Sequence, residues 1–382
     1  MSAEEERTSP RRPAAWHRPL WYLNGGLALL TLLTYVSVHV RPSTFWPVAL
    51  LGMSYPYLLL GHALLIAWWL LFRPRRALLS AIVLLLGWGH LGTYLQLLGR
   101  RSGDDQQERG VKVMSYNVRL FDLYNWSHNT NTRNEMFDLI RVEDPDILCL
   151  QEFFQADDPT EFITRDTLIT DFRFTQVHDV YTQHTKRGHH FGIATFTTLP
   201  IVGRGTIEFP DELNNLCIWS DVAIPGDTVR VYNAHLASIR FGDADYRFMK
   251  DLDTDTRSDS LRSGGLRILK RLRDAFIRRA GEVDRIVAHM AGSPHPIIFC
   301  GDLNDTPMSY SYHTLRDAGL RDAFVESGRG VGHTYIGDFP SFRIDHLLHG
   351  PELEAYDFRT LPEELSDHRA INALLVPVGD DQ

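Results

Sequence analysis

The stretch PIIFCGDLNDTPMS at residues 296–309 decides the fold that we expect for this chain. An apolar run, residues 297–300, leads into Gly301 and then into a polar cluster that contains Asp302 and Asn304. Side chains two positions apart on a strand share a face, so the pattern predicts a buried strand that presents a carboxylate and an amide at the edge of a sheet. An Asx-rich turn that merely closes a strand explains an isolated D-x-N equally well. The rest of the chain has to decide between these interpretations.

Charge divides the chain into two parts. Residues 1–103 contain ten arginines and three acidic residues, which leaves 29 basic and 45 acidic residues for positions 104–382. A net charge of −16 on the second part disfavours tight, non-specific binding of nucleic acid, although an enzyme that screens its phosphate substrate with a metal ion remains compatible with it. The three cysteines lie in apolar runs without C-x-x-C spacing, so we expect core residues rather than disulfides or a zinc site.

The first hundred residues contain three apolar stretches, at residues 21–40, 46–72 and 77–98. Each has about 20 residues or more without Lys, Arg, Asp or Glu, which is enough to cross a bilayer. Tryptophans lie near several of their ends, as interfacial aromatic residues do. The sequence therefore predicts three transmembrane helices over residues 21–98 that contact the lipid bilayer. A buried helical bundle of a soluble protein is the alternative.

Arginines predict the orientation of this multi-pass anchor. Residues 1–20 form a basic tail, and the loop after the second stretch contains Arg73, Arg75 and Arg76, whereas the loop after the first contains only Arg41. The positive-inside rule places the tail and the second loop in the cytoplasm. With three spans, the remainder of the chain lies on the outer (periplasmic or extracellular) face.

Residues 99–110 are polar and bounded by glycines, which is typical of a linker. From residue 111 to 376, strand patterns outnumber helix patterns and several strands follow each other directly. This order predicts an α/β domain of two packed sheets with helices outside, followed by a short tail, residues 377–382. The charged segment 240–263 is either a lid beside the site or a solvated loop.

Polar side chains recur where the predicted strands end. They are Asn117, Glu152, Asn233, His235, Asp302, Asn304, Asp345, Asp367 and His368. Burying so many carboxylates, amides and imidazoles costs free energy unless they converge on something polar. Convergent carboxylates repel each other, and a hard divalent cation removes that repulsion. A ligand set rich in oxygen suits Mg²⁺ or Mn²⁺ better than zinc.

The ordered set SYNVR, LQE, NAHL, GDLND, RIDH and SDH resembles the endonuclease/exonuclease/phosphatase superfamily of metal-dependent phosphodiesterases and phosphatases. The resemblance covers about residues 111–376. It implies a four-layer α/β sandwich (two packed mixed β-sheets flanked by helices) with the site at one end of the sheets. It also implies a hydrolase that uses Mg²⁺ or Mn²⁺.

The resemblance implies a role for each matching residue. Glu152 would be the principal metal ligand, with Asn117 and Asp367 close to the metal. Asp302 would deprotonate the attacking water, and Asn304 would hold that water or the phosphate. His368, oriented by Asp345, would donate a proton to a phosphoryl oxygen.

Four further residues are expected on the substrate side. His235 would contact the phosphate or assist the leaving group, and Asn233 would position it. His190 precedes a glycine strand at which relatives contact substrate, although a position without that contact is also possible. Arg343, two residues before Asp345, either binds phosphate or forms an ion pair.

The leading hypothesis is therefore a membrane-anchored phosphoesterase in which water attacks a phosphodiester or phosphomonoester in line. DNA, a phospholipid headgroup and an inositol phosphate remain open as substrates, and no protein partner is implied. The alternative is a non-catalytic scaffold or receptor domain of the same fold, held at the membrane.

Overall fold

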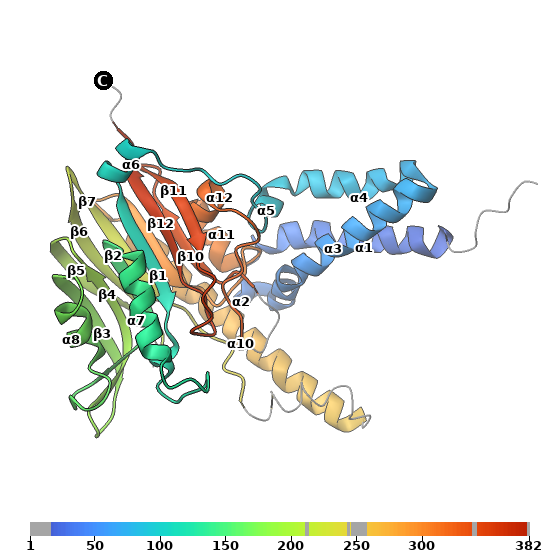
Figure 1. Ribbon diagram of the computed structural model, residues 1–382. Coiled ribbons are helices and arrows are strands. Elements are labelled where there is room, and N and C mark those ends of the chain that lie inside the picture. Colours follow the sequence, from blue (N-terminus) through green and yellow to red (C-terminus); the bar gives the residue numbers. More distant parts are fainter. Residues whose placement is uncertain (1–16, 211–213, 243–244, 246–257, 338–341, 380–382) are drawn as a thin grey trace, which may run out of the picture.

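The computed structural model describes residues 17–379, apart from 211–213, 243–244, 246–257 and 338–341. It contains an α/β sandwich, from which a bundle of apolar helices projects (Figure 1). Residues 1–16 of the predicted tail and most of the predicted 240–263 insertion lie outside the described residues, whereas residues 17–20 of the tail belong to the first helix, α1 (His17–Ser37).

Two mixed sheets form the inner layers of the sandwich. In the described residues, the first sheet has the strand order β11-β12-β1-β2-β4-β3 and the second has the order β5-β6-β7-β8-β10-β9. The strands of the first sheet are β1 (Val111–Asn117), β2 (Ile147–Ala156), β3 (Gln176–His184), β4 (His189–Thr197), β11 (Leu353–Thr360) and β12 (Ile371–Pro377). Those of the second are β5 (Ile201–Glu208), β6 (Leu216–Ile224), β7 (Asp227–His235), β8 (Ile297–Asp302), β9 (Arg321–Asp322) and β10 (Asp345–His349).

Apolar side chains fill the space between the sheets and the space under the outer helices. Val113, Cys149, Val231 and Cys300 belong to the cluster between the sheets, and Cys217 is also buried, so the prediction of core cysteines is confirmed. Outside the first sheet lie α7 (Thr132–Glu143) and α8 (Thr164–Thr170), and outside the second lie α10 (Ser258–Met290) and α11 (Tyr310–Asp317). The order helix, sheet, sheet, helix is the predicted sandwich.

The N-terminal bundle consists of α1 (His17–Ser37), α3 (Ala49–Phe72) and α4 (Pro74–Leu86). The short α2 (Pro42–Phe45) and the 3₁₀ turn η1 (Trp46–Val48) connect α1 to α3. Among the described residues, two segments are long and apolar enough to cross a membrane, His17–Ser37 and Pro42–Phe72. The third predicted span is not one long helix, because α4 ends at Leu86 and a short α5 (Trp88–Gly92) follows after Gly87. Gly87 lies between the two helices, where any larger side chain would overlap the Tyr35 ring.

The predicted linker is ordered rather than loose. It contains α6 (Asp104–Arg109), and the residues before this helix bind to the edge strand β11. Arg100 stacks on the Tyr356 ring and pairs with Glu354, while Arg101 pairs with Asp357. The bundle and the sandwich are therefore joined by a segment that is held to the sandwich.

Two further short helices in the described residues are η2 (Arg119–Asp122) and α12 (Ala323–Ser327).

Candidate active site

Strand register brings the polar strand ends together at one end of both sheets. In the second sheet, His235 of β7 lies opposite Asp302 of β8, and Asp302 lies opposite Asp345 of β10. In the first sheet, Asn117 ends β1, beside the segment of β2 that contains Glu152. The Asn117 side chain donates to Asp302 across the two sheets, with a distance of 3.0 Å between Nδ2 and Oδ2. This hydrogen bond between Asn117 and Asp302 links the ends of the two sheets.

Backbone irregularities aim two of these side chains. Glu152 has a φ of +49°, at a break in the register between β2 and β4. A left-handed conformation at a non-glycine residue costs free energy and is concentrated at functional sites. Asn304, with φ +51°, lies in a turn just beyond β8, where its N–H donates to Asp302 Oδ1 at 2.7 Å. Our expectation that Asp302 and Asn304 share one strand face is therefore wrong, because the strand ends at Asp302 and an Asx turn presents the amide.

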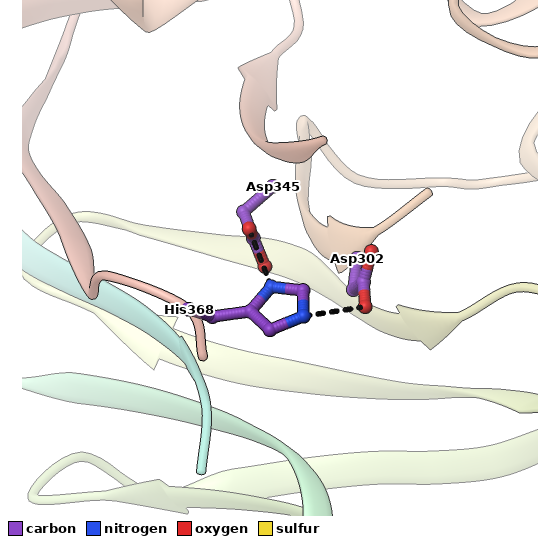
Figure 2. Close-up of side chains that lie close together, drawn as sticks. All are labelled: Asp302, Asp345 and His368. Atoms are coloured by element: carbon purple, nitrogen blue, oxygen red, sulfur yellow. Dashed lines mark hydrogen bonds and ion pairs between the residues drawn. The ribbon is translucent and has the colours of Figure 1, made fainter. Parts of the chain in front are cut away.

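Asp302, Asp345 and His368 form a buried line that is joined by one hydrogen bond and one ion pair (Figure 2). His368 Nδ1 lies 2.8 Å from Asp345 Oδ2, and its Nε2 lies 3.8 Å from Asp302 Oδ2. Burial alone would lower the pKa of His368, but the Asp345 and Asp302 carboxylates outweigh burial and raise the pKa well above its usual value. Burial raises the pKa of Asp302, which His368 partly offsets. The imidazole is therefore a cation that is oriented to donate from Nε2, beside a carboxylate made more basic by burial.

His235 and Glu152 complete the centre of the site. His235 Nε2 lies 3.7 Å from both Glu152 Oε1 and Asp302 Oδ2, and it is buried without a hydrogen-bond partner among the described residues. Asp345 Oδ1 is buried and unsatisfied in the same way. Buried polar atoms are rarely left without partners, so these atoms indicate a site built for a polar ligand.

The donor set fits a hard divalent cation. Glu152 and Asp367 both line the same pocket, and the pKa of Asp367 is raised by burial and also by the Glu152 carboxylate. Two carboxylates in each other's field are the arrangement that a divalent cation stabilises. Arg119 pairs with Asp367 at 3.3 Å and so shares this charge. The cluster of Asp302, Asp345 and His368 is also close enough to hold a metal ion.

Four of the predicted site residues have contacts that bear on their expected roles. The Oδ1 of Asn117 accepts from the Arg119 N–H while its Nδ2 donates to Glu152 and Asp302, so Asn117 faces the carboxylates as a hydrogen-bond donor. Asn233 is fully buried between the sheets, where Nδ2 donates to the Ala194 carbonyl and Oδ1 accepts from Gln151. It supports β7 behind His235 and does not reach a phosphate.

Arg343 and His190 also lie elsewhere. Arg343 is 1% exposed and forms a two-pronged ion pair with Asp322, so the ion-pair alternative is the one present, and burial prevents contact with substrate. His190 pairs with Asp157 at 3.0 Å and lies opposite Gln155, three residues beyond Glu152 along β2. It contributes to neither pocket that borders Glu152.

Sequence reasoning missed three contributors to the site. Arg119 and Ser366 lie within the SYNVR and SDH motifs, and Ser366 ties the Asn117 carbonyl to Asp367 through its hydroxyl. Motif position could have suggested both. Met53, from the N-terminal bundle, lines the pocket that contains Glu152, Asp367 and His368. No local signal marks Met53, because its role depends on how the bundle packs against the sandwich.

Comparison with known proteins agrees with this architecture. The family model described as "Endonuclease/Exonuclease/phosphatase family" matches residues 114–368, and a model described as "Domain of unknown function (DUF8431)" matches residues 17–94. A search of curated proteins found no match.

Solved structures resemble the chain in fold. An endonuclease/exonuclease/phosphatase from Beutenbergia cavernae DSM 12333 has 16% identity and a TM-score of 0.51, with 71% of this chain and 72% of that chain covered. The human Nocturnin catalytic domain has 17% identity and a TM-score of 0.49, with 71% and 94% covered. The mannosyl-6-phosphatase Bt3783 from Bacteroides thetaiotaomicron VPI-5482 has 17% identity and a TM-score of 0.48, with 70% and 99% covered. With the family match spanning most of the chain, this protein belongs to the endonuclease/exonuclease/phosphatase family, whose members hydrolyse phosphoester bonds.

Proposed function

We propose that this protein is a membrane-anchored, Mg²⁺- or Mn²⁺-dependent phosphoesterase in which Asp302 activates a water molecule and His368 donates to the phosphoryl group. The observation that carries the proposal is the buried line Asp345–His368–Asp302, which ends beside the carboxylate pair Glu152 and Asp367. A donor and a basic carboxylate within reach of one phosphoryl position are what in-line attack by water requires.

Each side chain has a defined task in this mechanism. Asp302 is held by Asn117 and Asn304, which fix the direction of its carboxylate, and it would accept a proton from the attacking water. His368, kept in one tautomer by Asp345, donates from Nε2 to an oxygen that gains negative charge. His235 lies between Glu152 and Asp302, where it hydrogen-bonds the phosphate or the departing oxygen.

Glu152 and Asp367 would hold the metal ion. When bound, Mg²⁺ or Mn²⁺ polarises a phosphoryl oxygen and neutralises charge that builds during attack. The bulge at Glu152 supports this role, since it turns the carboxylate into the pocket at a cost in backbone free energy.

The polarity of the N-terminal bundle supports insertion into a membrane. Its buried face carries polar side chains, with Asn24 bonded to Ser80 and Thr31 to His62, while leucines such as Leu71 and Leu86 are exposed. The core helix of a soluble protein would show the reverse arrangement. Only 28% of each long apolar segment is buried within the chain. In a bilayer, exposed leucine and internal polar contacts are favourable.

We include α4 as the third membrane segment and place the sandwich on the outer face. From Pro74 to Gly92 the α4–α5 pair would extend about 28 Å, close to the thickness of the hydrocarbon core. Arg73, Arg75 and Arg76 lie at the end of the bundle that is farthest from the sandwich, together with the start of α1 (Figure 1). The positive-inside rule then puts the sandwich outside.

The full-length protein in detergent tests the enzyme proposal with bis(p-nitrophenyl) phosphate. We expect turnover with Mg²⁺ or Mn²⁺, none with a chelator, and a loss of roughly 10²-fold or more in Asp302→Asn and Glu152→Gln. Asp138→Asn, at an exposed position of α7, is the matched control. Unchanged rates in both site variants, or full activity in chelator, would contradict the proposal. If the wild-type protein hydrolyses neither bis(p-nitrophenyl) phosphate nor DNA, lipid and inositol phosphate substrates, the non-catalytic scaffold is favoured.

A further inference from the structure

The cleft beside Glu152 has two lobes, each lined by both polar and apolar side chains, and the second lobe is the more apolar. One has a volume of about 380 Å³ and includes Gln183, Asn214 and Asn215; we call it the polar lobe. The other, about 330 Å³, includes Met53, Ile268 and Leu272; we call it the apolar lobe. Glu152, Ser238 and Arg240 border both. A phosphoryl group at the centre of the site would therefore have a mixed polar and apolar lobe on one side and a more apolar lobe on the other.

The wall of the apolar lobe comes from three separate parts of the chain. Ile268 and Leu272, one turn apart on α10, form one side, Phe342 and Ile344 form another, and Met53 of α3 closes the lobe from the bundle. Leaving such a wall in contact with water costs free energy, which an apolar ligand recovers on binding.

The lobe lies where the bundle meets the sandwich. Gly52 contacts the Met308 carbonyl closely, and Tyr55, Tyr94 and Met308 share one buried cluster. Arg41, in the loop between α1 and α2, pairs with Asp284 of α10 at 2.7 Å. Met53 is therefore at the end of α3 nearest the sandwich, at the level where exposed leucines of the bundle give way to the polar domain. A lipid beside the bundle would have the shortest path into this lobe.

The described first half of α10 has the composition of a helix at a membrane surface. Residues 263–273 include four basic residues, within a domain of net charge −16; Arg267 and Arg271 pair with Asp245, and Arg273 pairs with Asp274. Leu266 and Leu269 on this segment are exposed. Exposed leucine beside basic residues is typical of helices that lie in the interface of an anionic bilayer. Figure 1 shows this end of α10 projecting beyond the sheets on the side of the bundle.

We propose that the apolar lobe binds the hydrocarbon part of a membrane-lipid phosphoester, while the headgroup occupies the polar lobe. This inference rests on the proposed phosphoesterase function, because it places the scissile phosphoryl group at Glu152 and His368. The bundle then forms part of the substrate-binding site as well as the anchor.

A series of p-nitrophenyl alkyl phosphates tests the lobe with the full-length protein in amphipol, free of detergent. The ethyl, butyl, hexyl and octyl diesters share one leaving group and differ only in chain length. We expect kcat/KM to rise by up to about fourfold per methylene, mainly through KM, until the lobe is filled. Ile268→Asn and Met53→Asn should reduce the octyl-over-ethyl preference at least about fivefold. Leu269→Asn, exposed on α10 and outside the lobe, is the control.

Failure of this inference can be told apart from failure of the proposed function. Turnover of all four diesters at equal kcat/KM, or a plasmid DNA turned over with a higher kcat/KM than the octyl diester, overturns the lipid subsite and leaves a phosphoesterase. If no diester is hydrolysed, calorimetric binding of octylphosphonate and ethylphosphonate decides. Tighter binding of the octyl compound that Ile268→Asn abolishes supports the lobe without catalysis, and equal binding of both compounds overturns it.

Discussion

At the scale of single residues, Asp345 orients His368, with its Oδ2 2.8 Å from His368 Nδ1. Replacing it with asparagine removes the charge that holds the imidazolium and permits the wrong tautomer. We therefore expect Asp345→Asn to lower kcat by roughly 10²–10³-fold while KM changes little. Steady-state kinetics of Asp345→Asn beside the exposed control Asp138→Asn measure this, and a kcat within about threefold of wild type would rule out the positioning role.

His178 gives a pH dependence of stability that is independent of catalysis. It is 6% exposed, with Nδ1 3.0 Å from the Ser220 hydroxyl, and burial together with Arg204 lowers its pKa to about 4. In the unfolded chain the pKa of a histidine is near 6.5. As the pH falls below this value, His178 is therefore protonated in the unfolded chain but stays neutral in the folded protein. Stability is thus full above about pH 6.5 and is lost as pH falls toward 4.

Urea titrations of the solubilised chain at pH 7 and pH 5 test this assignment. Between these values wild type should lose up to about 2 kcal/mol more free energy of unfolding than His178→Asn, which keeps a hydrogen-bonding side chain but no proton uptake. Equal losses in the two proteins would show that His178 is protonated in the folded state.

The sequence largely predicted which motif residues come together in the site, because residues that end neighbouring strands lie at the same end of a sheet. His235, Asp302, Asp345 and His368 meet as the sequence predicts. Arg343 and Asn233 could not be assigned, because both outcomes depend on partners distant in sequence, Asp322 and Gln151. Alternation along a strand tells which face a side chain occupies but not which charge it meets there.

At the scale of elements, α3 packs against the sandwich at Gly52. A Cβ at this position would lie 1.9 Å from the Met308 carbonyl oxygen, a backbone atom that cannot rotate away. Gly52→Ala should therefore push α3 away from the segment that follows Asn304, lowering both the unfolding temperature and the activity. Gly25→Ala is the control, because nothing lies within 4 Å of a Cβ there. Thermal unfolding and turnover of both variants check this, and equal behaviour of the two would show that the contact is not maintained.

The length of an apolar stretch did not predict the third helix. Residues 77–98 are apolar throughout, yet α4 ends at Leu86, because Gly87 packs against Tyr35 and the chain then turns toward the sandwich. Tyr35 donates to the Val83 carbonyl in the same turn. The composition of a segment indicates that it is apolar. The length of the helix that it forms depends also on contacts with neighbouring helices.

At the scale of the whole molecule, the contact between the bundle and the sandwich had no signal in the sequence. Two separate patterns, an apolar region and a motif-bearing domain, suggested a tether with a free domain. Instead Arg41, Met53 and Tyr94 join the two parts directly, and the segment at Arg100 is fastened to β11. The orientation of the active-site cleft relative to the bundle is therefore set by side-chain packing.

The proposed topology predicts which positions face each side of the membrane. The native cysteines are buried, so introduced cysteines can be labelled selectively. Asn134→Cys lies on the sandwich and Arg75→Cys at the opposite end of the bundle, and both positions are exposed. In spheroplasts, a membrane-impermeant maleimide should label Asn134→Cys at once and Arg75→Cys only after permeabilisation, because the arginine-rich end stays in the cytoplasm. Labelling of both without permeabilisation would mean that the bundle does not cross the bilayer. The reverse pattern would place the cleft on the cytoplasmic face, where its lipid substrates would come from the inner leaflet.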